Sequence, residues 1–104
     1  MEINDITAFL VYGSTPAEFK QAATDHFDLL LAESERHPGA VFCLALHPFL
    51  INQPSRHRYL VEMLQYFTAH DNVWLATADE IADWYLTQHY DTALTALQAA
   101  RRRR

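Results

Sequence analysis

The stretch Ala40-Val41-Phe42-Cys43-Leu44-Ala45-Leu46 is apolar throughout and is followed directly by His47 and Pro48. A strand with one face in water alternates apolar and polar residues, whereas a strand of a parallel sheet is covered on both faces and shows a continuous apolar run. The stretch therefore predicts a parallel strand over residues 40–46 that ends at His47. In this interpretation Cys43 points into a layer of the sheet.

The segments on either side of this stretch predict helices. Two Thr-x-x-Glu sequences, Thr15 to Glu18 and Thr77 to Glu80, are typical of capping boxes, and Pro16 suits a first helical position. Pro54 is expected in the first turn of a helix between them. The expected core positions of the first helix are Phe19, Ala23, Phe27, Leu30 and Leu31, and those of the middle helix are Leu60, Met63, Leu64 and Phe67.

Residues 6–12 and 73–75 are short apolar segments that predict two more strands, and a final helix is expected after residue 91. Strands that alternate with helices predict parallel pairing through right-handed crossovers, and therefore an α/β fold. Three strands are few for such a sheet and would leave edges unpaired. We therefore expect an incomplete sheet, completed by self-association into a dimer or larger assembly or by an N-terminal half.

The length of 104 residues predicts one domain. One cysteine cannot close an intramolecular disulfide, and no apolar run approaches the roughly 20 residues that a membrane helix needs. The first residues also lack the pattern of a signal peptide. We therefore expect a soluble, cytoplasmic protein without a membrane partner.

Charge is distributed unevenly along the chain. Residues 101–104 are four of the eight basic residues, so four basic residues face 13 acids in residues 1–100, which leaves a formal charge of −9. A negative body argues against nucleic-acid binding, because affinity for phosphates comes from clustered Lys and Arg. The basic tail at residues 101–104 is interpreted as a solvated terminal run or an artificial extension rather than a nucleic-acid arm.

Four short motifs occur in order along the chain: Leu44-Ala45-Leu46-His47-Pro48, Gln53-Pro54-Ser55-Arg56, Val73-Trp74-Leu75-Ala76-Thr77 and Glu80-Ile81-Ala82-Asp83-Trp84-Tyr85. Together with Asn4-Asp5-Ile6 and the helix over residues 19–33, they resemble the C-terminal part of the polysaccharide deacetylase family (NodB homology, carbohydrate esterase 4-like), in its allantoinase-like branch. The resemblance implies that residues 1–100 are the last three βα units of a distorted (β/α) barrel. It also implies hydrolysis of non-peptide C–N bonds, with a sugar amide or a small-molecule amide as substrate.

The resemblance assigns a role to one residue, and the position of Arg56 near a helix start indicates a second candidate. Leu44 to His47 matches the family's L-x-L-H motif, which makes His47 the expected general acid that protonates the departing amine. The alternative for His47 is a strand-end histidine bonded to a loop carbonyl. A helix start is an unfavourable place for a cation, so Arg56 is the expected substrate-binding residue. It would make a bidentate contact to a carboxylate, in the substrate or in a neighbouring loop, and a structural salt bridge is the alternative.

The family's other motifs are absent. The sequence contains neither a T-F-D-D element nor an H-x-x-x-H pair, so the expected base and metal ligands are missing. We therefore predict no cofactor within this chain, a divalent metal in a complete enzyme, and little activity from the chain alone. The rival hypothesis is a non-catalytic α/β interaction or dimerisation module derived from the same fold.

Overall fold

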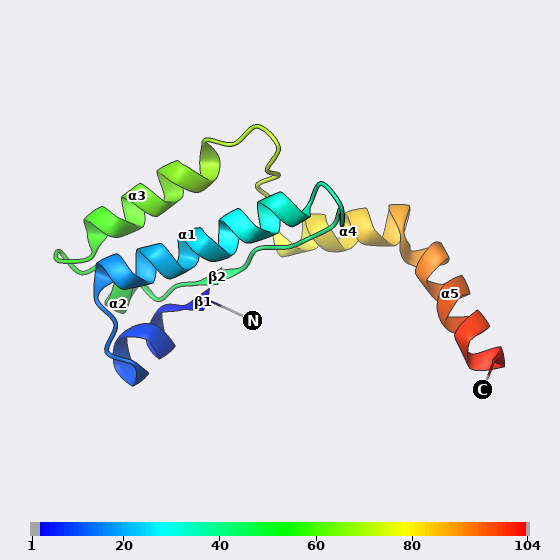
Figure 1. The fold of residues 1–104 in the computed structure, drawn as a ribbon, viewed down its shortest axis with the longest axis horizontal. Helices are drawn as coiled ribbons and strands as arrows, with labels where there is room; N and C mark the ends of the chain where they lie inside the picture. Colours follow the sequence, from blue (N-terminus) through cyan, green and yellow to red (C-terminus); the bar gives the residue numbers. More distant parts are fainter. Residues whose placement is uncertain (1–2, 104) are drawn as a thin grey trace. The chain divides into compact units, whose positions relative to one another are not determined.

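The computed structural model describes residues 3–103 (Figure 1). The elements in chain order are β1 (Ile3–Asn4), the π-helix η1 (Thr7–Val11), α1 (Pro16–Glu33), β2 (Leu44–Ala45), α2 (Pro48–Ile51), α3 (His57–Thr68), α4 (Ala78–Gln88) and α5 (Tyr90–Arg102). The chain divides into two compact units, the first ending at Val73 and the second beginning at Trp74.

The N-terminal unit contains a parallel strand pair. Ile3 of β1 lies opposite Leu44 of β2, and Asn4 lies opposite Ala45. Of the strand expected over residues 40–46, only Leu44–Ala45 is regular. Parallel pairing is therefore present, while the larger barrel remains a prediction.

Two expected strands are absent from the described residues. Residues 6–12, expected as a strand, contain η1, and residues 73–75 form neither strand nor helix. A strand needs a neighbour to satisfy its backbone groups, and within residues 3–103 the strand pairing that forms joins β1 to β2 alone. Helical hydrogen bonds satisfy the backbone of Thr7–Val11 instead, which buries Phe9 and leaves Leu10 and Val11 exposed.

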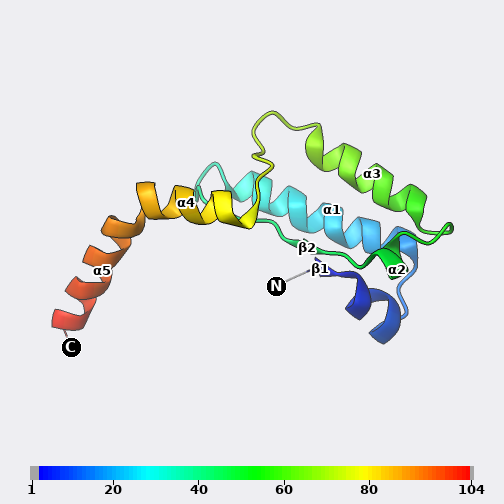
Figure 2. The same cartoon turned by 180° about the vertical axis from the view of Figure 1, so that it is seen from behind.

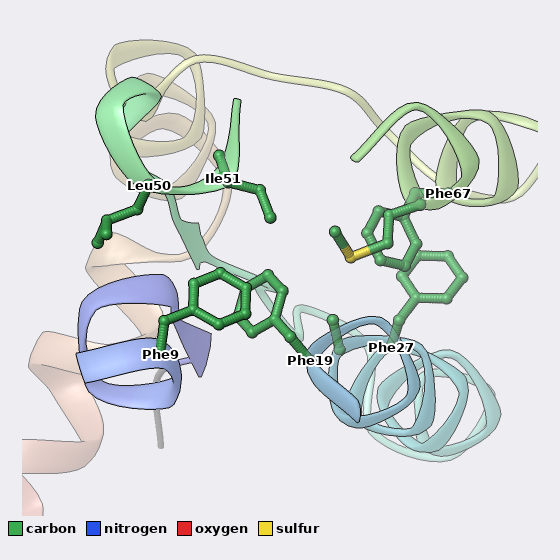
Figure 3. Packing of buried hydrophobic residues seen from close by; sticks show 8 residues of the cluster. Phe9, Phe19, Phe27, Leu50, Ile51 and Phe67 are labelled. Carbon is green, nitrogen blue, oxygen red and sulfur yellow. The ribbon is translucent and has the colours of Figure 1, made fainter. Parts of the chain in front are cut away.

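The core of the N-terminal unit lies where α1, α2, α3 and η1 meet (Figure 3). α3 runs alongside α1, as Figures 1 and 2 both show. The buried apolar residues are Phe9, Phe19, Ala23, Phe27, Leu50, Ile51, Met63 and Phe67. The predicted core positions of α1 and α3 are thus confirmed in large part, but the prediction for Leu64 is wrong, because it is 46% exposed.

Three phenylalanines from three segments hold one end of this core. The ring of Phe27 lies 4.7 Å from that of Phe67 and 5.7 Å from that of Phe42, measured between centroids. Because successive side chains of an extended segment point to opposite sides, the neighbour of Phe42 turns outward. Cys43 is accordingly exposed, and the prediction that it points into a sheet layer is wrong.

Both predicted capping boxes are present. The Thr15 hydroxyl accepts a hydrogen bond from the Glu18 N–H at 3.1 Å, while Glu18 accepts from the Thr15 N–H at 3.0 Å. The same pair of bonds joins Thr77 and Glu80 at the start of α4. The backbone N–H of the threonine lowers the pKa of each glutamate below its usual value.

The segment between β2 and α3 differs from the expected loop and helix start. Pro48 begins the short helix α2, because the His47 carbonyl accepts hydrogen bonds from the N–H groups of Leu50 and Ile51. A turn follows in which the Gln53 carbonyl accepts from two later N–H groups, and α3 begins at His57 rather than Pro54. This segment brings Arg56 back toward α2.

The C-terminal unit contains α4 and α5, which meet at His89. The His89 ring lies 4.4 Å from the Trp84 ring and 6.2 Å from the Tyr85 ring, between centroids. Neither helix buries any of its residues. Over the described part of the chain, no helix has both the length and the apolar character needed to cross a membrane.

Candidate functional site

The carboxyl ends of β1 and β2 bring two polar residues together. Asp5 follows the last residue of β1, and His47 lies two residues beyond the end of β2, at the N-cap of α2. Because the two strands are parallel, their carboxyl ends meet at the same edge of the sheet. The fold thereby joins two residues that lie 42 positions apart in sequence.

Asp5 contacts His47 through both of its carboxylate oxygens. The His47 backbone N–H donates to Asp5 Oδ2 at 2.7 Å, and His47 Nδ1 lies 2.7 Å from Asp5 Oδ1. Asp5 is fully buried, whereas the His47 side chain is 38% exposed. One oxygen therefore positions the backbone of His47 and the other orients its ring, which stays partly exposed.

The chemistry of the two groups decides which ring nitrogen is used. A carboxylate can only accept hydrogen bonds, so Nδ1 carries the proton that it shares with Asp5. The Nε2 atom is then the one that can meet a substrate. A neutral ring offers an acceptor there, and an imidazolium offers a donor whose positive charge is stabilised by Asp5.

An exposed aromatic side chain borders His47. The Phe49 ring meets the imidazole edge-on, with 5.9 Å between the ring centroids, and Phe49 is 62% exposed. Phe49 belongs to α2, whose first turn is held by the His47 carbonyl. The imidazole therefore lies beside an exposed apolar side chain.

Arg56, the expected substrate-binding residue, lies against two elements of the N-terminal unit. Its Nη1 donates to the Leu50 carbonyl at 3.0 Å, and its guanidinium carbon lies 4.5 Å from the centroid of the Phe9 ring. In residues 3–103 the guanidinium thus meets a carbonyl and a ring rather than a carboxylate. Its contact with a substrate stays a prediction, as does the general-acid role of His47.

Sequence reasoning did not assign a role to Asp5. No strand is predicted at Ile3–Asn4, so Asp5 enters the sequence pattern only within Asn4-Asp5-Ile6. The sequence nevertheless contains a sign of this role, because Asp5 directly precedes an apolar segment. If that segment joins the core, the acidic side chain is buried with it and needs a polar partner. His47, which also precedes a buried segment, is the partner the fold supplies.

Metal-ligating side chains do not gather into a site in the described part of the chain. Within residues 3–103 no three His, Cys, Asp or Glu side chains come close enough together to hold an ion. The Asp5–His47 pair offers two groups that already satisfy each other.

Comparison with known proteins gives one informative match. The chain is 29% identical over 90 residues to a Schizosaccharomyces pombe protein named "Putative polysaccharide deacetylase". The match covers 86% of this chain and 28% of that protein, so the chain spans little more than a quarter of the relative's length. No protein-family model matches the chain, and no solved structure matches it. Most of this chain thus resembles one segment of a protein named as a polysaccharide deacetylase.

Proposed function

We propose that this chain carries the proton-donating part of an enzyme that hydrolyses non-peptide C–N bonds, with His47 as the general acid. The observation that supports the proposal best is the pair of 2.7 Å contacts between buried Asp5 and His47. The resemblance to a polysaccharide deacetylase supplies the reaction class. The allantoinase-like branch and the position of the chain at the C-terminal end of a barrel are finer parts of the same proposal.

In the proposed reaction, the acyl carbon of an amide gains the hydroxyl of a water molecule while its C–N bond breaks. The departing nitrogen cannot leave as an anion at neutral pH, so it must receive a proton. His47 donates that proton from Nε2, and Asp5 keeps the ring oriented and stabilises its charge beforehand. The base that takes the proton from water lies outside this chain, which accounts for the missing T-F-D-D and H-x-x-x-H motifs.

A chimera tests the proposal. The S. pombe relative would receive this chain in place of its own matched segment, and hydrolysis of N-acetylated sugar oligomers would be followed beside the unmodified relative. Loss of a general acid lowers rates by about 10² to 10⁴, so His47→Gln should reduce turnover by that factor. The matched control is His37→Gln, since His37 is exposed and only its backbone is hydrogen-bonded.

The chimera experiment separates a loss of catalysis from a loss of folding. Circular dichroism establishes that each variant folds, so a loss of turnover is not a loss of structure. A folded chimera that keeps its turnover after His47→Gln contradicts the general-acid role. So does a folded chimera that never turns over a substrate that the unmodified relative hydrolyses.

A second candidate function is a dimerisation module that binds another copy of this chain, and the C-terminal unit favours it. α4 begins with Asp79 and Glu80 in its first turn, and α5 ends with Arg101 and Arg102 in its last. Two copies aligned in opposite directions would place the acidic start of one unit beside the basic end of the other. The large apolar side chains available to such a contact are Trp84, Tyr85, Leu86, Tyr90, Leu94 and Leu97.

Sedimentation of the whole chain tests this candidate. The dimer should dissociate when Leu94 and Leu97 are both changed to Ser, and Arg101→Glu should weaken it because like charges would then face each other. His47→Gln should leave the assembly unchanged. A monomer at tens of micromolar contradicts the candidate.

A further inference from the structure

Arg56 contacts the two elements that follow the members of the Asp5–His47 pair. η1 begins two residues after Asp5 and carries Phe9, whose ring lies under the guanidinium. α2 begins directly after His47 and carries Leu50, whose carbonyl accepts from Arg56 Nη1 at 3.0 Å. The Arg56 side chain thereby connects η1, which follows Asp5, with α2, which follows His47.

The connection to His47 is short. The Leu50 N–H donates to the His47 carbonyl at 2.9 Å, so the residue that receives the Arg56 hydrogen bond is itself bonded to His47. Figure 3 shows Phe9 on η1 and Leu50 on α2, both of them buried in the core. A guanidinium is suited to this place, because its flat face stacks on a ring while its edge donates in the plane.

We propose that Arg56 is a positioning residue that holds α2 against η1 and so keeps His47 within hydrogen-bond reach of Asp5. The proposal rests on the proposed function for its catalytic meaning. The hydrogen bond and the ring contact of Arg56 go to Leu50 and Phe9, so it acts on the pair through these two residues. If Arg56 only held the turn that leads into α3, the Asp5–His47 contacts would not depend on it, and this distinguishes the two roles experimentally.

Amide hydrogen exchange of the whole chain measures that geometry directly. The His47 N–H is protected by buried Asp5, so its exchange rate reports the closed pair. Arg56→Gln removes the stacking and the charged donor, and the His47 amide should then exchange about tenfold faster or more. The proton on Nδ1, followed by nitrogen NMR of the ring, should lose its preference for that atom.

Two further variants complete the test. Phe9→Leu keeps an apolar core residue but removes the ring, and it should change His47 exchange in the same direction, with an effect that does not add to that of Arg56→Gln. The matched control is Arg58→Gln, because the Arg58 side chain is 72% exposed and contacts Tyr59 and Glu62 of its own helix. Exchange at Met63 in α3 should stay constant in all three variants.

His47 exchange within twofold of the parent in both Arg56→Gln and Phe9→Leu would overturn the positioning role. In the chimera, a rise in KM for an acidic substrate with unchanged kcat and unchanged His47 exchange would overturn it as well, in favour of a substrate contact. Failure of the proposed function looks different. In that case Arg56→Gln still loosens His47, while His47→Gln leaves turnover intact.

Discussion

Replacing Asp5 by Asn should weaken the N-terminal unit and reverse the tautomer of His47. An amide has the size of a carboxylate, so the packing around this buried position is preserved. Its oxygen can still accept from the His47 backbone N–H, but its NH₂ group then faces Nδ1 and can only donate. The ring must therefore turn Nδ1 into an acceptor and carry its proton on Nε2.

The magnitude follows from the two contacts. Each joins a carboxylate oxygen to a nitrogen of His47 at 2.7 Å, and hydrogen bonds to charged groups contribute about 1.5 to 3 kcal/mol each. Asp5→Asn removes the charge from both bonds and replaces one oxygen by an NH₂ group, so we expect a loss of about 2 to 3 kcal/mol in the free energy of unfolding. Asp5→Ala removes both, at about 3 to 6 kcal/mol, which is a large share of the stability of a small domain.

Urea unfolding followed by circular dichroism measures the loss. Tryptophan fluorescence is unsuitable, because Trp74 and Trp84 both lie beyond the boundary of the N-terminal unit. Nitrogen NMR of the ring identifies the protonated atom, and Asp71→Asn, which removes an exposed charge, is the control. An Asp5→Asn protein within about 0.5 kcal/mol of the parent, with Nδ1 still protonated, would refute this account of the site.

Three further changes test the fold. Thr15→Ala should cost about 1 kcal/mol in the free energy of unfolding, because the capping bond to the Glu18 N–H is lost. The pKa of Glu18 is lowered in the folded chain, so its contribution to the cap is present above pH 4.5 and is lost as pH falls below that value. Thermal melts at neutral and acid pH check both expectations. Tyr66→Phe removes the hydrogen bond to Asp28, which raises the pKa of Tyr66. The stabilisation from this bond should be present below pH 10.0 and lost as pH rises further. Urea unfolding at several alkaline pH values checks this, and the absence of any difference between parent and variant would contradict it. Phe27→Ala should cost about 3 to 5 kcal/mol through the cavity it leaves among buried rings, and a loss under about 1 kcal/mol would contradict the packing described.

The helix starts were predictable from the sequence because their causes are local. Thr15 and Thr77 each bond a glutamate three residues later, and those contacts form wherever the chain turns into a helix. The apolar spacing of α1 likewise predicted which side chains enter the core, and Phe19 and Phe27 are buried as expected. The apolar run before His47 located the candidate general acid at the end of an extended segment, which the structure retains in shortened form.

Tertiary structure alone decided the partner of His47. Asp5 lies 42 residues away, and only the parallel register of β1 and β2 places its carboxylate beside that ring. The same is true of η1, since whether residues 6–12 form a strand depends on having a neighbour to receive their backbone hydrogen bonds. Long-range contacts of this kind leave no periodic trace in the sequence, because each residue involved satisfies its chemistry through a group that the chain brings near only when it folds.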